Sequence, residues 1–124
     1  MAGRILIVDD DPLLCSLLRM ALNREGFETH EVFSGKAALE YLSGALVDLV
    51  LLDVMMADFN GFDVLRMIKA DPRLERVPVI LLTARGDGTS QQTGFGIGAV
   101  EYLIKPITPD VLVKRVRAVL DAQS

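Results

Sequence analysis

Cysteine is almost absent from the sequence, and several other features that mark particular classes of protein are missing as well. The single cysteine, Cys15, cannot form a disulfide within the chain, and its leucine-rich surroundings predict a small, buried side chain. A reducing, cytoplasmic location fits this composition best. The N-terminal residues lack the charged segment, the longer apolar segment and the cleavage site of a signal peptide. No apolar run is long enough to cross a bilayer, so no contact with a membrane is expected.

An excess of basic residues is lacking too. The 13 Lys and Arg residues against 17 Asp and Glu residues give a net charge of -4, which predicts no direct binding to nucleic acid. The length of 124 residues and the apolar content of 51% suit one domain that buries a single core. We therefore expect a single domain over residues 1–124, which could be one part of a longer protein.

Short apolar runs alternate with helical patterns along the chain. Runs rich in β-branched residues and leucine predict strands that are buried on both faces, and a weaker run predicts a half-exposed strand. The predicted strands are Ile5–Val8, Phe27–Phe33 (the half-exposed one), Leu49–Asp53, Val79–Thr83 and Ala99–Ile104. This alternation predicts an α/β fold, in which a doubly wound parallel sheet is covered by helices on both faces.

Capping residues mark where the helices begin. Asp11, Ser34 and Thr108 are predicted N-caps, and two of them precede a proline that suits the first helical position. The predicted helices run from Pro12 to before Gly26, from Gly35 to about Leu42, from Gly61 to before Asp71, and from Pro109 to about Leu120.

A fourth helix is expected between Arg85 and Ala99, but five glycines interrupt it. Each interior glycine costs a helix about 1 kcal/mol relative to alanine. We therefore predict that this helix is short or mobile, and that its ordering is part of the function. The GFGIG run at 94–98 does not indicate a dinucleotide-binding loop, because its spacing is wrong and it precedes a strand.

Polar residues follow four of the predicted strands at their carboxyl ends, where ligands bind in open α/β sheets. They are Asp9 and Asp10 after the first strand, Asp53 at the end of the third, Thr83 at the end of the fourth and Lys105 after the fifth. Three clustered carboxylates would repel one another unless a cation joined them. Oxygen ligands in an open cluster suit Mg²⁺ best, so Mg²⁺ is the predicted cofactor.

A carboxylate in such a cluster can also accept a phosphoryl group. A metal, the Lys105 ammonium and the Thr83 hydroxyl would neutralise and orient the incoming group. Taken singly, each residue has an ordinary structural explanation as a cap, a turn former or a packed side chain, and Asp11 is expected to be a cap only. A charge directly after the apolar run that ends at Leu52 is costly without a function, and this favours Asp53 as the acceptor.

Four segments together resemble the receiver domains of two-component response regulators, and the resemblance covers essentially the whole chain. They are ILIVDDD at 5–11, LVLLDVMMADFNGFDVL at 49–65, VPVILLTA at 77–84 and YLIKP at 102–106. The resemblance to these chemotaxis-regulator-like domains implies a flavodoxin-like sheet of five parallel strands in the order 2-1-3-4-5.

The resemblance also implies roles for single residues. Asp53 would be phosphorylated, and Asp53 and Asp10 would bind Mg²⁺ directly. Asp9 would act through the water shell of the metal, and Met55 would contribute its backbone carbonyl.

Further implied features concern the switch. Thr83 would turn toward the phosphoryl group while Tyr102 moves inward, which would remodel the surface formed by the fourth helix, fifth strand and fifth helix. An aromatic residue such as Tyr102 within a strand could also simply pack. The peptide bond between Lys105 and Pro106 is expected to be cis.

Some positions depart from the family pattern. Ala57 stands where many receivers have proline and Asn60 where many have aspartate, which puts the rigidity of that loop in doubt. Gly61 still permits a tight approach to the next helix. Met55 and Arg85 lie two residues beyond Asp53 and Thr83, and could both shield the acyl phosphate, so we predict a phosphorylated state that is not especially short-lived.

The predicted function is that of a phosphoacceptor switch rather than a conventional enzyme. Its expected partners are a sensor histidine kinase or a histidine phosphotransfer protein, and a downstream protein target or output domain. A monomer or weak dimer is expected. Two alternatives stay open: a phosphatase with an aspartyl-phosphate intermediate, which Met55 in place of a second carboxylate disfavours, and a pseudo-receiver that acts by contacts alone.

Overall fold

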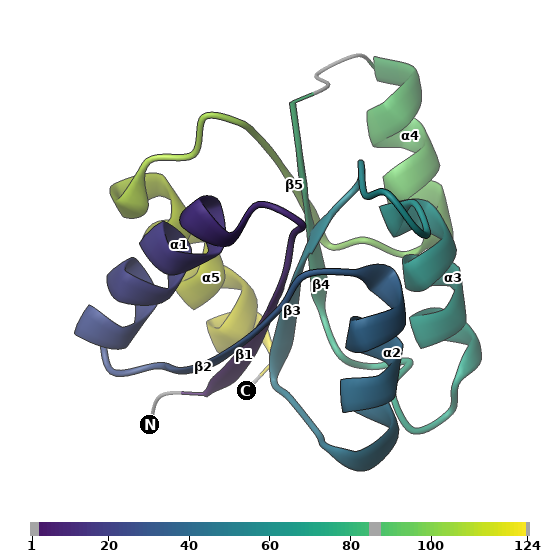
Figure 1. The fold of residues 1–124 in the computed structure, drawn as a ribbon, viewed down its shortest axis with the longest axis horizontal. Helices are drawn as coiled ribbons and strands as arrows, with labels where there is room; N and C mark the ends of the chain where they lie inside the picture. The colour runs from purple at the N-terminus through teal and green to yellow at the C-terminus, as the bar shows by residue number, and fades with distance from the viewer. Residues whose placement is uncertain (1–2, 85–87, 124) are drawn as a thin grey trace.

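The computed structural model describes residues 3–84 and 88–123, and within these ranges five strands alternate with five helices (Figure 1). The strands are β1 (Arg4–Val8), β2 (Glu28–Val32), β3 (Leu49–Asp53), β4 (Val79–Thr83) and β5 (Glu101–Ile104). The helices are α1 (Pro12–Arg24), α2 (Gly35–Gly44), α3 (Gly61–Ala70), α4 (Gly88–Ile97) and α5 (Pro109–Ala122).

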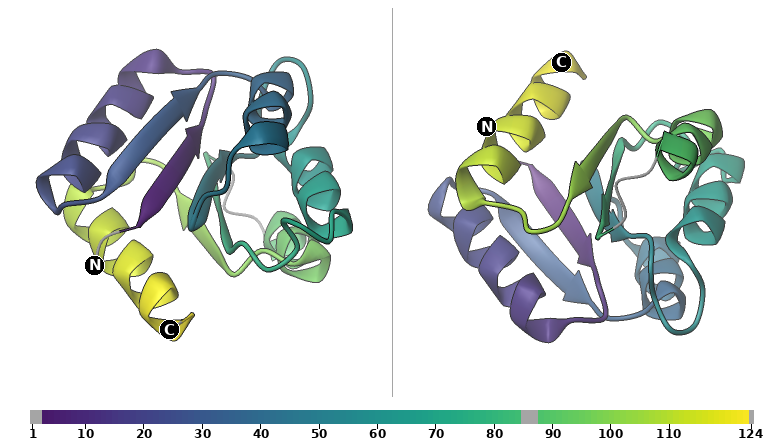
Figure 2. Two further views of the ribbon diagram at one scale, coloured as in Figure 1. Left: turned by 90° about the horizontal axis from the view of Figure 1, so that it is seen from below. Right: turned by 90° about the horizontal axis from the view of Figure 1, so that it is seen from above.

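The strands form one parallel sheet in the order β2-β1-β3-β4-β5, which confirms the predicted flavodoxin-like topology. Helices α1 and α5 cover one face of the sheet, and α2, α3 and α4 cover the other (Figures 1 and 2). None of the described helices has both the length and the apolar character needed to span a membrane.

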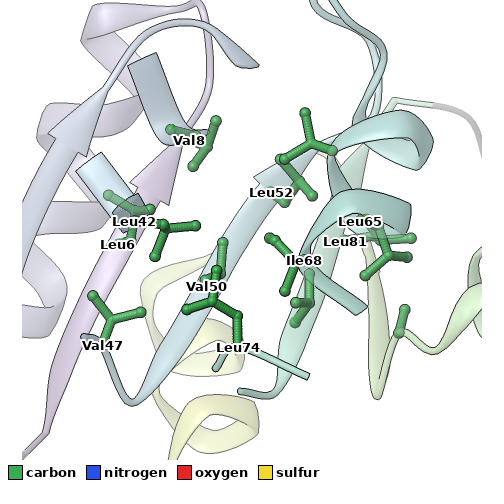
Figure 3. Close-up of a cluster of buried hydrophobic side chains, with 14 of the residues drawn as sticks. Leu6, Val8, Leu42, Val47, Val50, Leu52, Leu65, Ile68, Leu74 and Leu81 are labelled. Atoms are coloured by element: carbon green, nitrogen blue, oxygen red, sulfur yellow. The ribbon is translucent and has the colours of Figure 1, made fainter. Parts of the chain in front are cut away.

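Alternate residues of the central strands feed two separate cores. Leu6, Val50 and Leu81 face α2, α3 and α4, as the close-up in Figure 3 shows. Their neighbours Ile5 and Leu51 face α1 and α5. Because both faces are covered, the strands have no polar face, and this explains their continuous apolar runs. Strand β2 lies at an edge and alternates between exposed and more buried residues, as its weaker pattern predicted.

The predicted helix caps are confirmed. The Asp11 carboxylate accepts hydrogen bonds from the backbone N–H groups of Leu13 and Leu14. Ser34 caps α2 and Thr108 caps α5 in the same way, each through its side-chain oxygen. These caps satisfy N–H groups that have no partner within the helix.

Helix α4 is not short, contrary to the prediction from its glycines. It has ten residues, as do α2 and α3. A β-carbon at Gly94 would lie 2.5 Å from Cδ1 of Leu81, so glycine at this position lets the helix pack directly on β4. Tertiary packing thus outweighs low helix propensity. The mobility of α4 stays a prediction.

Candidate functional site

The parallel register brings the carboxyl ends of the strands together. Val8 of β1 pairs with Leu52, so Asp9 follows β1 beside the end of β3. Asp53 pairs with Leu82 of β4, which places it next to Thr83. The backbone N–H of Lys105 donates to the carbonyl oxygen of Thr83 at 2.7 Å, so the residue after β5 is fixed at the same edge.

Three carboxylates meet at this edge and form what we call the acid cluster, Asp9, Asp10 and Asp53. One carboxylate oxygen from each residue lies within 4.8 Å of those of the other two. Asp9 and Asp53 are 0% and 2% exposed, whereas Asp10 is open to solvent. The cluster therefore combines two buried acids with one at the entrance.

Lys105 is the cation that holds the two buried acids. Its Nζ donates to Oδ2 of Asp9 at 2.8 Å and to Oδ1 of Asp53 at 3.2 Å. The backbone N–H of Asp11 donates to the other oxygen of Asp9 at 3.0 Å. One ammonium facing three carboxylates leaves an excess of negative charge at the site.

The electrostatics of Asp53 and Lys105 follow from this arrangement. Burial raises the pKa of Asp53 to about 6, and the charge of Asp9 adds to the effect, while Lys105 opposes it. Burial alone would lower the pKa of Lys105, but the hydrogen bond to Asp9 and the charge of Asp53 outweigh it and raise that pKa. Lys105 therefore stays charged, and the surroundings of Asp53 disfavour its ionised form.

The residues present suit a divalent cation. The donor atoms are carboxylate oxygens, which are the ligands that Mg²⁺ and Ca²⁺ prefer. The cluster is partly open at Asp10, which leaves room for the waters that Mg²⁺ retains. A cation at this place would also favour the ionised form of Asp53, which burial and the charge of Asp9 disfavour. The acid cluster can therefore bind a metal.

Other predicted site residues lie around the cluster. Thr83 is fully buried at the end of β4. Met55 lies in the loop between β3 and α3, and its side chain is exposed. The Lys105–Pro106 peptide bond is cis. Arg85, which was expected to shield the phosphoryl group, lies outside the described residues.

Tyr102 packs in the core on the side of the sheet that α2, α3 and α4 cover. It is 8% exposed in the core next to α4, and its ring centroid is 6.4 Å from that of Phe95. The structure therefore shows a packed aromatic residue, one arrangement that the strand pattern allowed.

Two features near the site were not predicted. The Cys15 thiol donates to the carbonyl oxygen of Asp9 at 3.4 Å, and burial raises the pKa of Cys15 to about 12, so the thiol stays protonated. The Asp58 carboxylate, in the loop after Asp53, accepts hydrogen bonds from the start of α2. Nothing in the local sequence pattern connects Asp58 with a segment 23 residues earlier.

Comparison of the sequence with known proteins finds a family and close relatives. Residues 5–117 match the model of the response regulator receiver domain. The chain is 44% identical over 118 residues to the DNA-binding response regulator MtrA of Mycolicibacterium smegmatis, covering 95% of this chain and 50% of that protein. It is also 44% identical to the transcriptional regulatory protein CpxR of Escherichia coli, covering 95% and 49%. The chain thus spans about half the length of the curated relatives it matches.

Comparison of the structure agrees with this result. The fold superposes on the chemotaxis response regulator CheY4 of Vibrio cholerae with a TM-score of 0.91. The sequences are 26% identical, and the match covers 96% of this chain and 99% of that chain. The arrangement of all five strands and helices is therefore shared.

Proposed function

The chain belongs to the response regulator receiver family, the signalling domains of two-component systems, and from this premise we propose that it is a phosphoacceptor switch acting through Asp53. One observation carries the proposal. The buried Asp53 carboxylate lies in a cluster of three acids and is held by the ammonium of Lys105. Oxygen ligands, a nucleophilic carboxylate and a fixed cation are the parts that phosphoryl transfer to a carboxylate requires.

Asp53 and Asp10 would hold Mg²⁺ directly, together with the backbone carbonyl of Met55, and Asp9 would act through the metal's waters. When bound, the metal supplies positive charge that stabilises the negative oxygens of the phosphoryl group. Three ionised acids and one ammonium give the site a net charge of about -2, which a divalent cation would neutralise. Mg²⁺ is the proposed ion because the site is open and uses oxygen donors only.

In the transfer step, a carboxylate oxygen of Asp53 attacks the phosphorus of a phosphohistidine on the partner. The new O–P bond forms as the N–P bond breaks, and the imidazole nitrogen leaves with the electron pair. Lys105 would exchange its hydrogen bond to Asp53 for one to a phosphoryl oxygen, and Thr83 would donate another. The donor would be a sensor histidine kinase or a histidine phosphotransfer protein.

The output would be a change of the surface formed by α4, β5 and α5. Thr83 would turn toward the phosphoryl group, and Tyr102, whose ring contacts that of Phe95, would shift with it. This surface would then bind a downstream protein or an output domain. We propose residues 1–124 as one receiver domain without nucleic-acid contacts of its own, although the relative MtrA is described as DNA-binding. A cytoplasmic location and a monomeric or weakly dimeric state stay predictions.

Intact mass after incubation with acetyl phosphate tests the proposal. Wild-type protein and Asp53→Asn are each incubated with MgCl₂ or with EDTA. We expect the wild type to gain one phosphoryl group in Mg²⁺ only, and the variant to gain none. Loss of the adduct over time then measures the lifetime of the phosphorylated state.

Other results would select the alternatives. Absence of an adduct, together with failure to bind a beryllofluoride mimic, would favour a pseudo-receiver that acts by contacts alone. Rapid turnover of acetyl phosphate would favour a phosphatase, although the exposed methionine two residues after Asp53 offers no acid or base for that reaction.

A further inference from the structure

The first turn of α2 is capped by a carboxylate from a different part of the chain. Oδ1 of Asp58 accepts from the backbone N–H of Gly35 at 3.0 Å, and Oδ2 accepts from that of Lys36 at 2.9 Å. Ser34 satisfies the next two N–H groups, through its hydroxyl and its carbonyl oxygen. The N–H groups of Gly35, Lys36 and Ala37, which have no partner within the helix, are therefore all bonded, two of them to Asp58.

The start of α2 is also tightly packed against the loop that carries Asp58. A β-carbon on Gly35 would lie 2.9 Å from Cγ2 of Val64 and 3.0 Å from Cβ of Phe59. The loop between β3 and α3 therefore presses against the start of α2, where a side chain at residue 35 would not fit. Hydrogen bonds from Lys36, Phe59 and Gly35 lower the pKa of Asp58, so its carboxylate is ionised at neutral pH next to the positive end of the helix.

This loop also carries part of the proposed metal site. At its start, the N–H of Val54 donates to the carbonyl oxygen of Leu82 at 2.9 Å. At its end, the N–H of Gly61 donates to the carbonyl oxygen of Val54 at 2.7 Å. Met55 and Asp58 lie between these two fixed points, three residues apart. A restraint on Asp58 therefore limits the positions that the carbonyl of Met55 can take.

We propose that Asp58 is a positioning residue for the metal site, because its carboxylate clamps the loop that presents the Met55 carbonyl to the first turn of α2. The inference rests on the proposed function and adds to it a residue outside the acid cluster. Mg²⁺ requires nearly ideal octahedral geometry, so it binds more tightly when its ligands are already in place. Without the clamp, part of the binding energy goes into ordering the loop.

Calorimetric titration of the metal-free protein with MgCl₂ tests this role. The variants are Asp58→Ala, Asp58→Asn and the control Asp63→Asn, which removes a nearby carboxylate paired with Arg66 rather than with α2. We expect Asp58→Ala to weaken Mg²⁺ binding roughly three- to tenfold, by analogy with partners that orient metal ligands. Asp58→Asn keeps an acceptor oxygen and is expected to lose less. Asp63→Asn is expected to bind as the wild type does.

The comparison separates a clamp from simple loss of charge. Asp58→Ala and Asp58→Asn carry the same net charge, so a difference between them reports the hydrogen bonds. Amide exchange at Gly35 and Lys36 is expected to be faster in Asp58→Ala without metal. At saturating Mg²⁺, the rate of phosphorylation by acetyl phosphate is expected to stay within roughly twofold, because the lost affinity is then compensated by mass action.

Three outcomes would overturn the inference. Unchanged Mg²⁺ affinity in Asp58→Ala, with faster exchange in α2, would assign Asp58 to stability alone. Equal weakening in Asp63→Asn would assign the effect to charge. Absence of Mg²⁺ binding by the wild type would instead refute the proposed metal site itself, and the inference would fall with it.

Discussion

Asp53, the proposed phosphoacceptor, carries a charge at a position where that charge lowers the stability of the domain. It is the last residue of β3, whose residues are all buried, and its charge lies next to that of Asp9. Burial and, to a lesser extent, the charge of Asp9 raise the pKa of Asp53 to about 6, although Lys105 opposes them. The folded protein therefore binds a proton at Asp53 more tightly than the unfolded chain does.

Replacing Asp53 by asparagine should consequently stabilise the metal-free domain in a pH-dependent way. In the wild type, the stabilisation from protonated Asp53 is complete below about pH 4 and is lost as the pH rises through about 6. We expect Asp53→Asn to be more stable than the wild type by about 2–3 kcal/mol at pH 7.5 and by little at pH 4. Urea unfolding in EDTA across this range measures the difference. An equal stabilisation at every pH would contradict this prediction. Asp121→Asn, which replaces an exposed carboxylate, is the control and should show no such pH dependence.

Asp10 and Asp11 are neighbours with different predicted effects. Asp11 caps α1, so Asp11→Ala should reduce the free energy of unfolding by about 1 kcal/mol and leave phosphorylation unchanged. Asp10 has its carboxylate in the acid cluster, so Asp10→Ala should slow Mg²⁺-dependent phosphorylation. Urea unfolding and intact mass measure the two properties. Equal loss of phosphorylation in both variants would show that the cap also shapes the site.

The sequence was informative at residues whose position is set locally. Asp9, Asp53 and Lys105 each end an apolar run or follow one, and parallel pairing then brings strand ends together. Asp58 could not be found in this way, because its partners lie 23 and 22 residues earlier and belong to another element. A carboxylate in a polar loop has no local pattern that distinguishes a clamp from a solvated side chain.

At the scale of elements, the glycines of α4 have different environments. A β-carbon at Gly94 would strike the buried Leu81, whereas one at Gly96 meets nothing within 4 Å. Composition alone treats the two positions alike, which is why it predicted a short or mobile helix.

Alanine substitutions should separate these two glycines. Gly96→Ala should stabilise the domain by about 1 kcal/mol, because alanine has the higher helix propensity. Gly94→Ala should destabilise it by about 1–3 kcal/mol, because the added methyl group overpacks the interface between α4 and β4. Urea unfolding of both variants measures the difference. Stabilisation by both would indicate that α4 moves freely away from the sheet.

Element boundaries were predicted to within two residues, and the differences have local causes. Strand β5 begins at Glu101 rather than Ala99, because the N–H of Ala99 still donates to Gly94 at the end of α4. Gly98 has a φ of 130°, which turns the chain toward the sheet. Strand β2 begins after Phe27 for the same kind of reason, since the N–H of Phe27 donates to Leu22 of α1.

For the whole molecule, the apolar cores and the proposed functional site lie at different places in one sheet. The middle of each central strand contributes to the two apolar cores, and these hold the helices on both faces. The carboxyl edge instead carries two buried acids and one lysine. A cation that binds this edge only in the folded state must stabilise the entire domain, because the acids are brought together only by folding.

Mg²⁺ should therefore raise the thermal stability of the wild type as its concentration increases. At ten times the dissociation constant, the expected gain is about 1.4 kcal/mol, or roughly 3–6 °C in Tm for a domain of this size. Thermal unfolding in a MgCl₂ series, with NaCl at matched ionic strength as control, measures it. NaCl screens the repulsion among the acids but does not occupy a site, so its effect should be smaller.

Asp10→Ala should lose the part of the gain in stability that is specific to Mg²⁺, because it removes the exposed ligand and leaves the buried acids with Lys105. Equal gains in the two salts would show that the acid cluster responds to screening alone, and that the strand ends carry charge without a metal site.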